Sequence, residues 1–245
     1  MSSARWLVLM VLVGALSAGE DALPTPERFG GETNGLRVVL DLALPPLGDQ
    51  TRARVLALLA ERSLFGWPAG PTLEASLNAY AAATRADLAA ARRDNPGAAS
   101  LARWFSDAAV TTTWSGGNLL SLSLTQDGYL GGAHGMAMRG ALVIDLATLR
   151  LLTLDDLIAP ADQETFAEAL TQAYRVQQKL QSDAILKDHG LSVDRLPAAM
   201  PLIVASGLDV CFEPYVVGPW SLGVVTVHLT RDQARPFLRL DPWNR

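Results

Sequence analysis

The alternation of apolar and polar positions has a period of two from Ala108 to residue 125, which predicts a pair of β-strands. Apolar residues at every second position alternate mostly with serine and threonine, and Gly116-Gly117-Asn118 interrupts the alternation as a hairpin turn does. One apolar face and one hydroxyl-rich face are typical of a half-buried antiparallel sheet. A second turn is expected at Asp127-Gly128, and the next strand at Met138–Leu146.

Other segments along the chain also have the composition and punctuation of strands. The first is closed by Pro45-Pro46, and the last ones are separated by a segment, residues 213–223, that contains too much proline and glycine for a strand. These predicted strands are Leu36–Leu44, Leu151–Leu154, Leu202–Ala205, Leu208–Phe212 and Val224–Leu229.

Helical spacing of apolar residues predicts helices at 51–64, 73–94, 162–180 and 231–238. Thr72, Asp162 and Thr230 are the expected N-caps of the last three, and Asn95-Pro96-Gly97 ends the second. In the third helix we expect the apolar face, which includes Val176, to point inward. Together the elements predict an α+β fold, a mainly antiparallel sheet packed with a few helices.

The segment Tyr129–Met136 joins two predicted strands and contains Gly131, Gly132 and His134. Glycine reaches positive φ without strain, and a glycine pair within a strand pattern marks a bulge or a sharp bend. Such a bend would turn His134 out of the sheet, where imidazole can donate from one nitrogen and accept at the other. Two interpretations remain open: a structural corner in which His134 bonds to a neighbouring carbonyl, or a binding site.

Residues 1–18 have the features of an export signal. Arg5 supplies the positive start, an unbroken apolar run extends over Trp6–Leu16, and small residues follow. The run is too short to span a bilayer. We expect cleavage after Ala18 or Ala15 and a periplasmic or secreted protein without stable membrane insertion, with an uncleaved anchor as the alternative. The remainder divides into a strand and helical region, 19–107, and an α+β region, 108–245, expected to form one compact unit.

Charge and cysteine content narrow the function classes. The 245 residues include 25 acidic and 20 basic side chains, a formal net charge of −5. The surface therefore lacks the basic excess that nucleic-acid binding uses, and we predict no nucleic-acid partner. Cys211 is the only cysteine, so no intramolecular disulfide can form, and its apolar surroundings predict a buried, inert thiol.

The sequence contains no recognisable motif for metal, cofactor or nucleophilic chemistry. A zinc site needs three or four clustered ligands, but His134, His189 and His228 are far apart in the sequence. No phosphate-binding or dinucleotide-binding glycine motif occurs, so no cofactor is predicted. The segment Gly218–Gly223, with Ser221 in it, is one residue longer than the Gly-x-Ser-x-Gly elbow of serine hydrolases and contains proline.

Two further groups have both a functional and a structural interpretation. Asp155-Asp156 can act as a general acid–base pair or cation site, but the acidic first turn of a short helix is the interpretation we favour. Tyr215, Pro219 and Trp220 form an aromatic and proline cluster. Tyrosine and tryptophan favour binding surfaces, although they can equally fill the end of a sheet.

Two segments carry a resemblance to a known family. The first is Tyr129-Leu130-Gly131-Gly132-Ala133-His134-Gly135, with Ile144-Asp145-Leu146 and Leu154-Asp155-Asp156-Leu157 after it, and the second is Pro214–Gly223. They resemble the extracytoplasmic domain family shared by the anti-sigma factor RsiV and the peptidoglycan deacetylase PdaC. The family motifs are Tyr-x-Gly-Gly-Ala-His and Pro-Tyr-Glu-aliphatic-Ala-Pro-Tyr-Ala-x-Gly. In the second motif Val216, Gly218 and Trp220 replace Glu, Ala and Tyr.

The resemblance implies an α+β fold and, from RsiV, a domain that binds lysozyme. We therefore expect an exported, non-catalytic binding domain for a lysozyme-like protein or a cell-wall glycan. A cell-envelope hydrolase that uses His134 as its base and a structural envelope protein are the alternatives. The candidate ligand-binding residues are Tyr129, Gly131, Gly132, His134, Gly135, Tyr215, Pro219 and Trp220.

Overall fold

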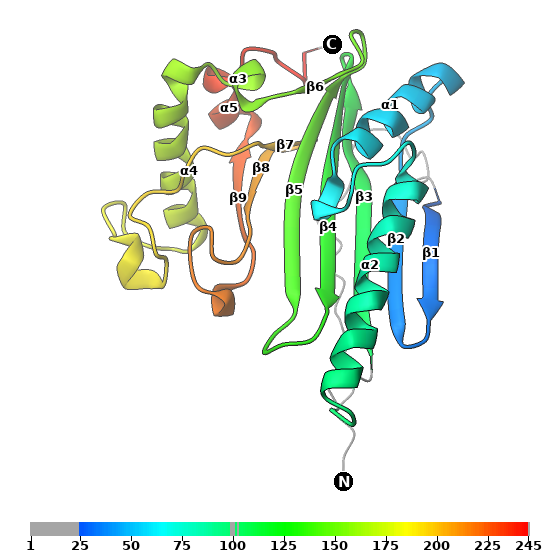
Figure 1. Ribbon diagram of the computed structural model, residues 1–245. Helices are drawn as coiled ribbons and strands as arrows, with labels where there is room; N and C mark the ends of the chain where they lie inside the picture. Colours follow the sequence, from blue (N-terminus) through cyan, green and yellow to red (C-terminus); the bar gives the residue numbers. More distant parts are fainter. Residues whose placement is uncertain (1–24, 99–100, 102, 245) are drawn as a thin grey trace.

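A computed structural model describes residues 25–98, 101 and 103–244. The expected export signal at 1–18 lies outside these residues. Figure 1 shows two sheets side by side, with helices on the outer face of each. The architecture confirms the predicted α+β class.

The larger sheet has six strands in sequence order, and the smaller has three. Neighbouring strands are antiparallel with one exception, because β2 and β3 run parallel. A parallel pair needs a crossover connection, which the first two helices supply. The strands of the larger sheet are β1 (Glu27–Thr33), β2 (Leu36–Ala43), β3 (Trp104–Gly116), β4 (Leu119–Tyr129), β5 (Met136–Asp145) and β6 (Arg150–Leu152), and those of the smaller are β7 (Leu202–Val204), β8 (Gly207–Phe212) and β9 (Val225–Thr230).

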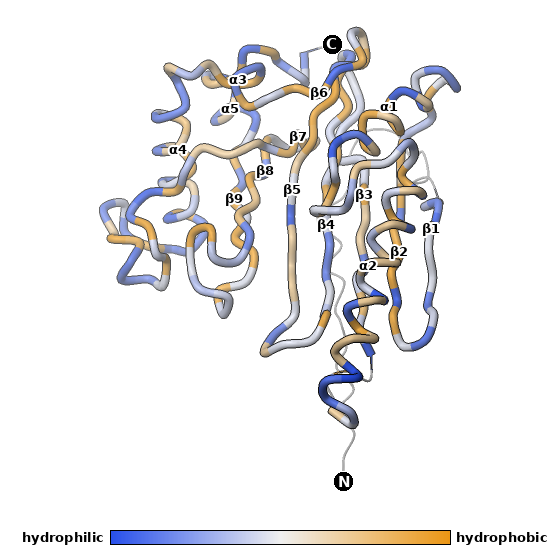
Figure 2. Tube along the Cα trace, viewed as in Figure 1, coloured by the Kyte–Doolittle hydropathy of each residue, from blue (hydrophilic) through white to orange (hydrophobic). Residues whose placement is uncertain are grey.

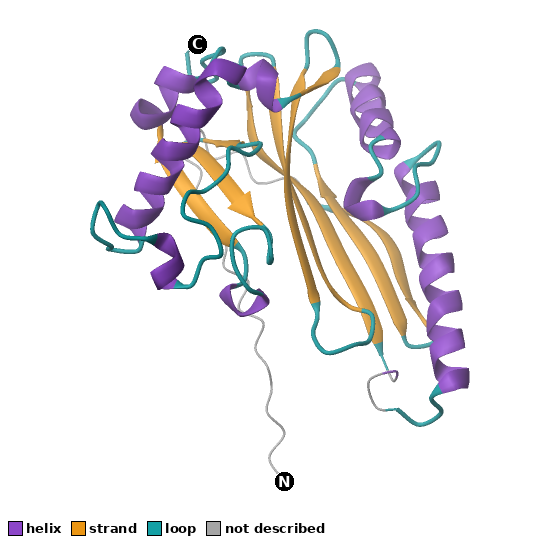
Figure 3. Cartoon of the chain, turned by 60° about the vertical axis from the view of Figure 1, so that its left-hand side comes forward, coloured by secondary structure: helices purple, strands orange, loops and turns teal. Residues whose placement is uncertain are grey.

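The helices divide between the two sheets. Figure 3 shows two of them along one face of the larger sheet, with the smaller sheet and the remaining helices beyond the opposite face. The α-helices are α1 (Asp49–Glu61), α2 (Leu73–Asp94), α3 (Leu154–Leu157), α4 (Gln163–Gln177) and α5 (Arg231–Ala234). Short 3-10 helices are η1 (Leu64–Gly66), η3 (Pro160–Asp162), η4 (Leu186–His189), η5 (Trp220–Leu222) and η6 (Arg235–Phe237).

The two hydrophobic cores share strands β4 and β5. Successive side chains of a strand point to opposite faces, so Leu142 and Ile144 of β5 join the core under α1 and α2, while Val143 joins the core under α4. Figure 2 shows that β4 and β5 are more hydrophobic where the smaller sheet approaches them than at their far ends. The shared strands therefore fix the smaller sheet against the larger one.

The hydroxyl-rich face of β4 differs from the expectation of a half-buried sheet. Ser121 is fully buried because β7 packs over it, and its hydroxyl accepts a hydrogen bond from the Ile203 N–H at 3.0 Å. The expected turn at Asp127-Gly128 is also wrong, since both residues lie within β4 and pair with β5. The face of β4 that was predicted to be exposed to solvent is therefore, at the Ser121 end, part of the interface between the two sheets.

One strand is not predicted from the sequence, and one expectation is corrected. The glycine-rich stretch before residue 36, for which no element is predicted, forms strand β1, which pairs with β2 along its whole length. Val176 does not point inward: it is 74% exposed, because α4 ends one residue later and its last turn extends past the smaller sheet. The remaining predicted strands and helices are present with boundaries shifted by a few residues.

Caps define several helix starts as expected. The Thr72 hydroxyl accepts from the Ala75 N–H, and Thr230 forms a capping box with Gln233. Asp162 precedes α4 but its side chain makes no capping hydrogen bond.

Across residues 25–98, 101 and 103–244, no helix has the length and apolar character needed to cross a bilayer.

Candidate functional site

The loop between β4 and β5 is built on its two glycines. Gly131 has φ +84° and Gly132 has φ +96°, in the region that side chains rarely adopt. A Cβ on Gly131 would lie 3.0 Å from the ring of Trp104, which is buried in the core under α1 and α2. The Tyr129 hydroxyl donates to the Gly132 carbonyl at 2.9 Å and closes the loop on itself. The bend therefore needs glycine at these positions.

His134 lies at the tip of this bend, and both of its ring nitrogens are engaged. Nδ1 is 2.7 Å from the Gly135 carbonyl, and Nε2 is 3.2 Å from the Tyr215 hydroxyl. A carbonyl can only accept, so Nδ1 donates to Gly135, while Nε2 shares a hydrogen bond with the Tyr215 hydroxyl. The ring thus connects the glycine bend to Tyr215.

Trp220 completes a cluster of three rings with His134 and Tyr215, here called the aromatic corner. The His134 and Trp220 rings stack with centroids 4.4 Å apart and an interplanar angle of 18°. Tyr215 lies 6.2 Å from His134 and 6.3 Å from Trp220. The glycine bend and the late proline-aromatic loop therefore meet at these three rings.

The proline-aromatic loop is fixed at its base and exposed at its tip. Val217 is buried, and its carbonyl accepts from the Ser192 N–H at 2.8 Å. Tyr215 has a positive φ of +71° although it is not glycine, and it is 63% exposed. Val216 beside it is 50% exposed. Backbone strain with large exposed apolar side chains is typical of functional loops rather than of packing.

Glu213 attaches this loop to the larger sheet. Its carboxylate accepts from the backbone N–H of Arg139 in β5 at 2.8 Å. The Arg139 guanidinium in turn bonds to Asp127 on β4 at 3.0 Å. Sequence reasoning did not identify Glu213 or Arg139. The strand alternation places Arg139 and Asp127 on one face of the sheet, which was the available signal.

The predicted site residues do not all have the same part in this arrangement. His134, Tyr215 and Trp220 are brought together, while Tyr129 and the glycines Gly131, Gly132 and Gly135 shape the loop that carries His134. Pro219 is exposed and precedes η5, which positions Trp220. A general base needs a reacting group within hydrogen-bond reach. In this structure both His134 nitrogens are bonded within the two loops, to the Gly135 carbonyl and to the Tyr215 hydroxyl.

The other titratable candidates lie away from the aromatic corner. His228 Nδ1 is 2.7 Å from an Asp209 oxygen across β8 and β9. Cys211 lies 3.5 Å from the Thr226 hydroxyl, and partial burial raises the pKa of its thiol, which keeps it protonated and unreactive. His189 is exposed in η4. No cluster of three or more metal-binding side chains occurs among the described residues.

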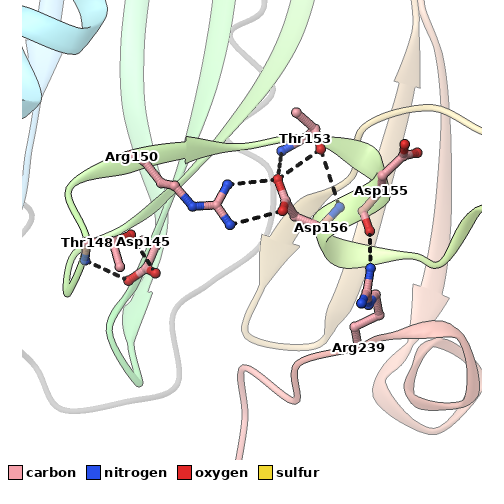
Figure 4. A network of polar contacts seen from close by, with 7 residues as sticks. All are labelled: Asp145, Thr148, Arg150, Thr153, Asp155, Asp156 and Arg239. Atoms are coloured by element: carbon pink, nitrogen blue, oxygen red, sulfur yellow. Dashed lines mark hydrogen bonds and ion pairs between the residues drawn. The ribbon is translucent and has the colours of Figure 1, made fainter.

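Asp155 and Asp156 stabilise structure, in line with the interpretation favoured from sequence. Asp156 forms a capping box with Thr153 and a two-point ion pair with Arg150, as Figure 4 shows. The Arg150 guanidinium and the Thr153 groups hold the pKa of Asp156 well below its usual range. The Asp155 carbonyl accepts from Arg239 at 2.9 Å, which joins α3 to the C-terminal segment.

The whole architecture is similar to solved structures of the DUF3298 family. One, from Bacteroides fragilis NCTC 9343, has 19% sequence identity, with 89% of this chain and 92% of that chain covered and a TM-score of 0.67. Another, from Pseudomonas aeruginosa PAO1, has 22% identity, coverage of 90% and 96%, and a TM-score of 0.57. Identities this low indicate a shared fold. No protein-family model and no curated protein matches the chain.

Proposed function

We propose that this chain is an exported, non-catalytic binding domain whose ligand surface is the aromatic corner with its exposed neighbour Val216. The proposal places the domain in the periplasm or outside the cell, on the basis of the signal-like residues 1–18. The candidate ligands are a lysozyme-like protein and a cell-wall glycan. Both come from the resemblance to the domain shared by RsiV and PdaC, and the DUF3298-like fold is compatible with either.

The observation that carries the proposal is the exposure of Tyr215 and Val216 on a strained but firmly attached loop. An isolated exposed side chain needs no explanation, but two adjacent large ones do, when one of them, Tyr215, is held at positive φ beside a stacked imidazole and indole. Holding them in place before binding lowers the entropic cost of association. Aromatic anchors of this kind carry much of the binding energy at protein interfaces.

The polar groups of the corner favour a protein over a glycan. A glycan site combines an aromatic platform with free hydrogen-bonding groups, but here the Tyr129, Tyr215 and His134 polar atoms are bonded within the loop pair. One face of Trp220 is covered by His134. What remains exposed is mainly apolar surface, which suits an apolar patch or cleft on a protein such as lysozyme.

Calorimetric titration of the exported form, residues 19–245, against lysozyme and against muropeptides tests the proposal. We expect saturable binding to lysozyme and a loss of about 30-fold in affinity for Tyr215→Ala, since buried interface anchors contribute about 2 kcal/mol or more. Val176→Ala is the control, because Val176 is also a large exposed apolar side chain, 74% exposed, but lies on α4. Absence of binding to both ligands would overturn the proposed function.

A further inference from the structure

The aromatic corner is assembled from two parts of the chain that belong to different sheets. His134 comes from the loop between β4 and β5 of the larger sheet, while Tyr215 and Trp220 come from the segment between β8 and β9 of the smaller sheet. The three rings keep their mutual distances only if residues 213–220 hold a fixed position against β5. Whatever fixes that segment therefore also fixes the surface offered to a ligand.

Glu213 anchors this segment through both its side chain and its backbone. One carboxylate oxygen accepts from the Arg139 N–H of β5 at 2.8 Å, and the Glu213 carbonyl accepts from the Val216 N–H at 3.1 Å. The second bond closes the turn at the exposed tip of the loop. Among the described residues, only one further hydrogen bond joins residues 213–220 to the larger sheet or its loops, and it lies within the aromatic corner itself.

Arg139 provides a fixed donor for this anchor. Its guanidinium turns back over β4, where it bonds to both Asp127 oxygens at 3.0 Å and to the Met138 carbonyl at 2.8 Å. The Glu213 carboxylate is bonded to a neutral backbone N–H and forms no ion pair with another described residue. An uncharged side chain with an acceptor oxygen in the same place can therefore form the same bond.

We propose that Glu213 is a positioning residue for the ligand surface: it sets the orientation of Tyr215 through the loop and is not itself a ligand contact. Tyr215 has a φ of +71°, which the loop keeps only while its surroundings hold it. Without the anchor the loop has to be ordered on binding, and the cost of that ordering lowers affinity. This inference rests on the proposed function, and it assigns control of that site to a residue outside the three rings.

Glutamine and alanine at position 213 separate the role of an acceptor from that of a charge. Amide hydrogen exchange on the free exported form measures the anchor, and calorimetric titration with lysozyme and with muropeptides as probes measures binding. We expect Glu213→Ala to speed exchange at Arg139 and Val216 about tenfold and to weaken binding of these probes about tenfold. Glu213→Gln keeps the acceptor oxygen and is expected to behave as the wild type in both measurements.

Two controls exclude a general loosening of the fold. Exchange at Leu40 and Val227, one in each core, is expected to stay as in the wild type, because neither core contains Glu213. Glu164→Ala removes an exposed carboxylate of α4 that bonds to Arg195 at 2.7 Å, and it is expected to leave binding unchanged.

The outcomes separate this inference from the proposed function. Equal losses of affinity for Glu213→Gln and Glu213→Ala assign the effect to the charge, as in direct contact with a cationic ligand, and overturn the positioning role. Unchanged affinity in Glu213→Ala also overturns it, while the proposed function stands if Tyr215→Ala still weakens binding. Faster exchange at Leu40 or Val227 indicates general destabilisation and overturns it as well. Absence of any binding by the wild type overturns both.

Discussion

Gly131 carries the aromatic corner on a backbone conformation that an alanine would strain. Its φ is +84°, and an added Cβ would also meet the buried Trp104 ring. We expect Gly131→Ala to lower the free energy of unfolding by about 3 kcal/mol, from positive φ and overpacking together. Gly132→Ala is the matched control, since its φ is +96° but its Cβ would point into open space. It should lose about 1 kcal/mol in urea denaturation. Equal losses would contradict the clash with Trp104.

Other residues of the corner differ in how far sequence could identify them. The glycine pair and His134 were identified from the strand pattern, because glycine has a local conformational meaning. The contact of His134 with Tyr215 joins residues far apart in the chain, and it was expected through the family motifs. Glu213 was missed because its acceptor role depends on which backbone groups of β5 face outward, and residue type does not encode that direction.

At the scale of elements, the sequence predicts those features that depend on a few neighbouring residues, such as helix caps and tight turns. The caps at Thr72 and Thr230 and the turn at Gly117-Asn118 follow from side-chain and backbone chemistry within a few residues. Strand β1 has little buried surface and is held by its pairing with β2, so its composition gave no strand signal. Val176 follows the helical period of α4, but tertiary position decides whether the last turn of a helix is covered.

Helix α3 and strand β6 are joined by the carboxylate of Asp156, which makes their stability dependent on pH. Because Arg150 and Thr153 lower its pKa in the folded state, Asp156 stabilises the fold above its unfolded pKa of 3.8. That contribution is lost as pH falls through the folded-state pKa. We expect Asp156→Ala to lower the melting temperature at pH 7 and the gap from the wild type to narrow below about pH 4. A gap that stays constant from pH 7 to pH 2 in thermal scans would contradict this assignment.

At the scale of the whole molecule, the two cores unfold together if the strands they share connect them. Both cores take side chains from β4 and β5, and the Ser121 hydroxyl bonds to Ile203 across the join. Loss of the smaller sheet would expose Val143 and leave the back of β5 in water. A single cooperative unit is therefore expected, although the chain is longer than most two-state domains.

Ser121→Ala tests this coupling because it leaves the buried Ile203 N–H without its acceptor. We expect a loss of about 1–3 kcal/mol, against about 0.5 kcal/mol or less for the control Ser123→Ala, which is half-buried on the same face. Native-state hydrogen exchange should report the same decrease at Leu40 in the core under α1 and α2 and at Val227 in the core under α4. If the decrease appears at Val227 alone, the smaller sheet opens independently, and the aromatic corner, which spans both sheets, would open with it.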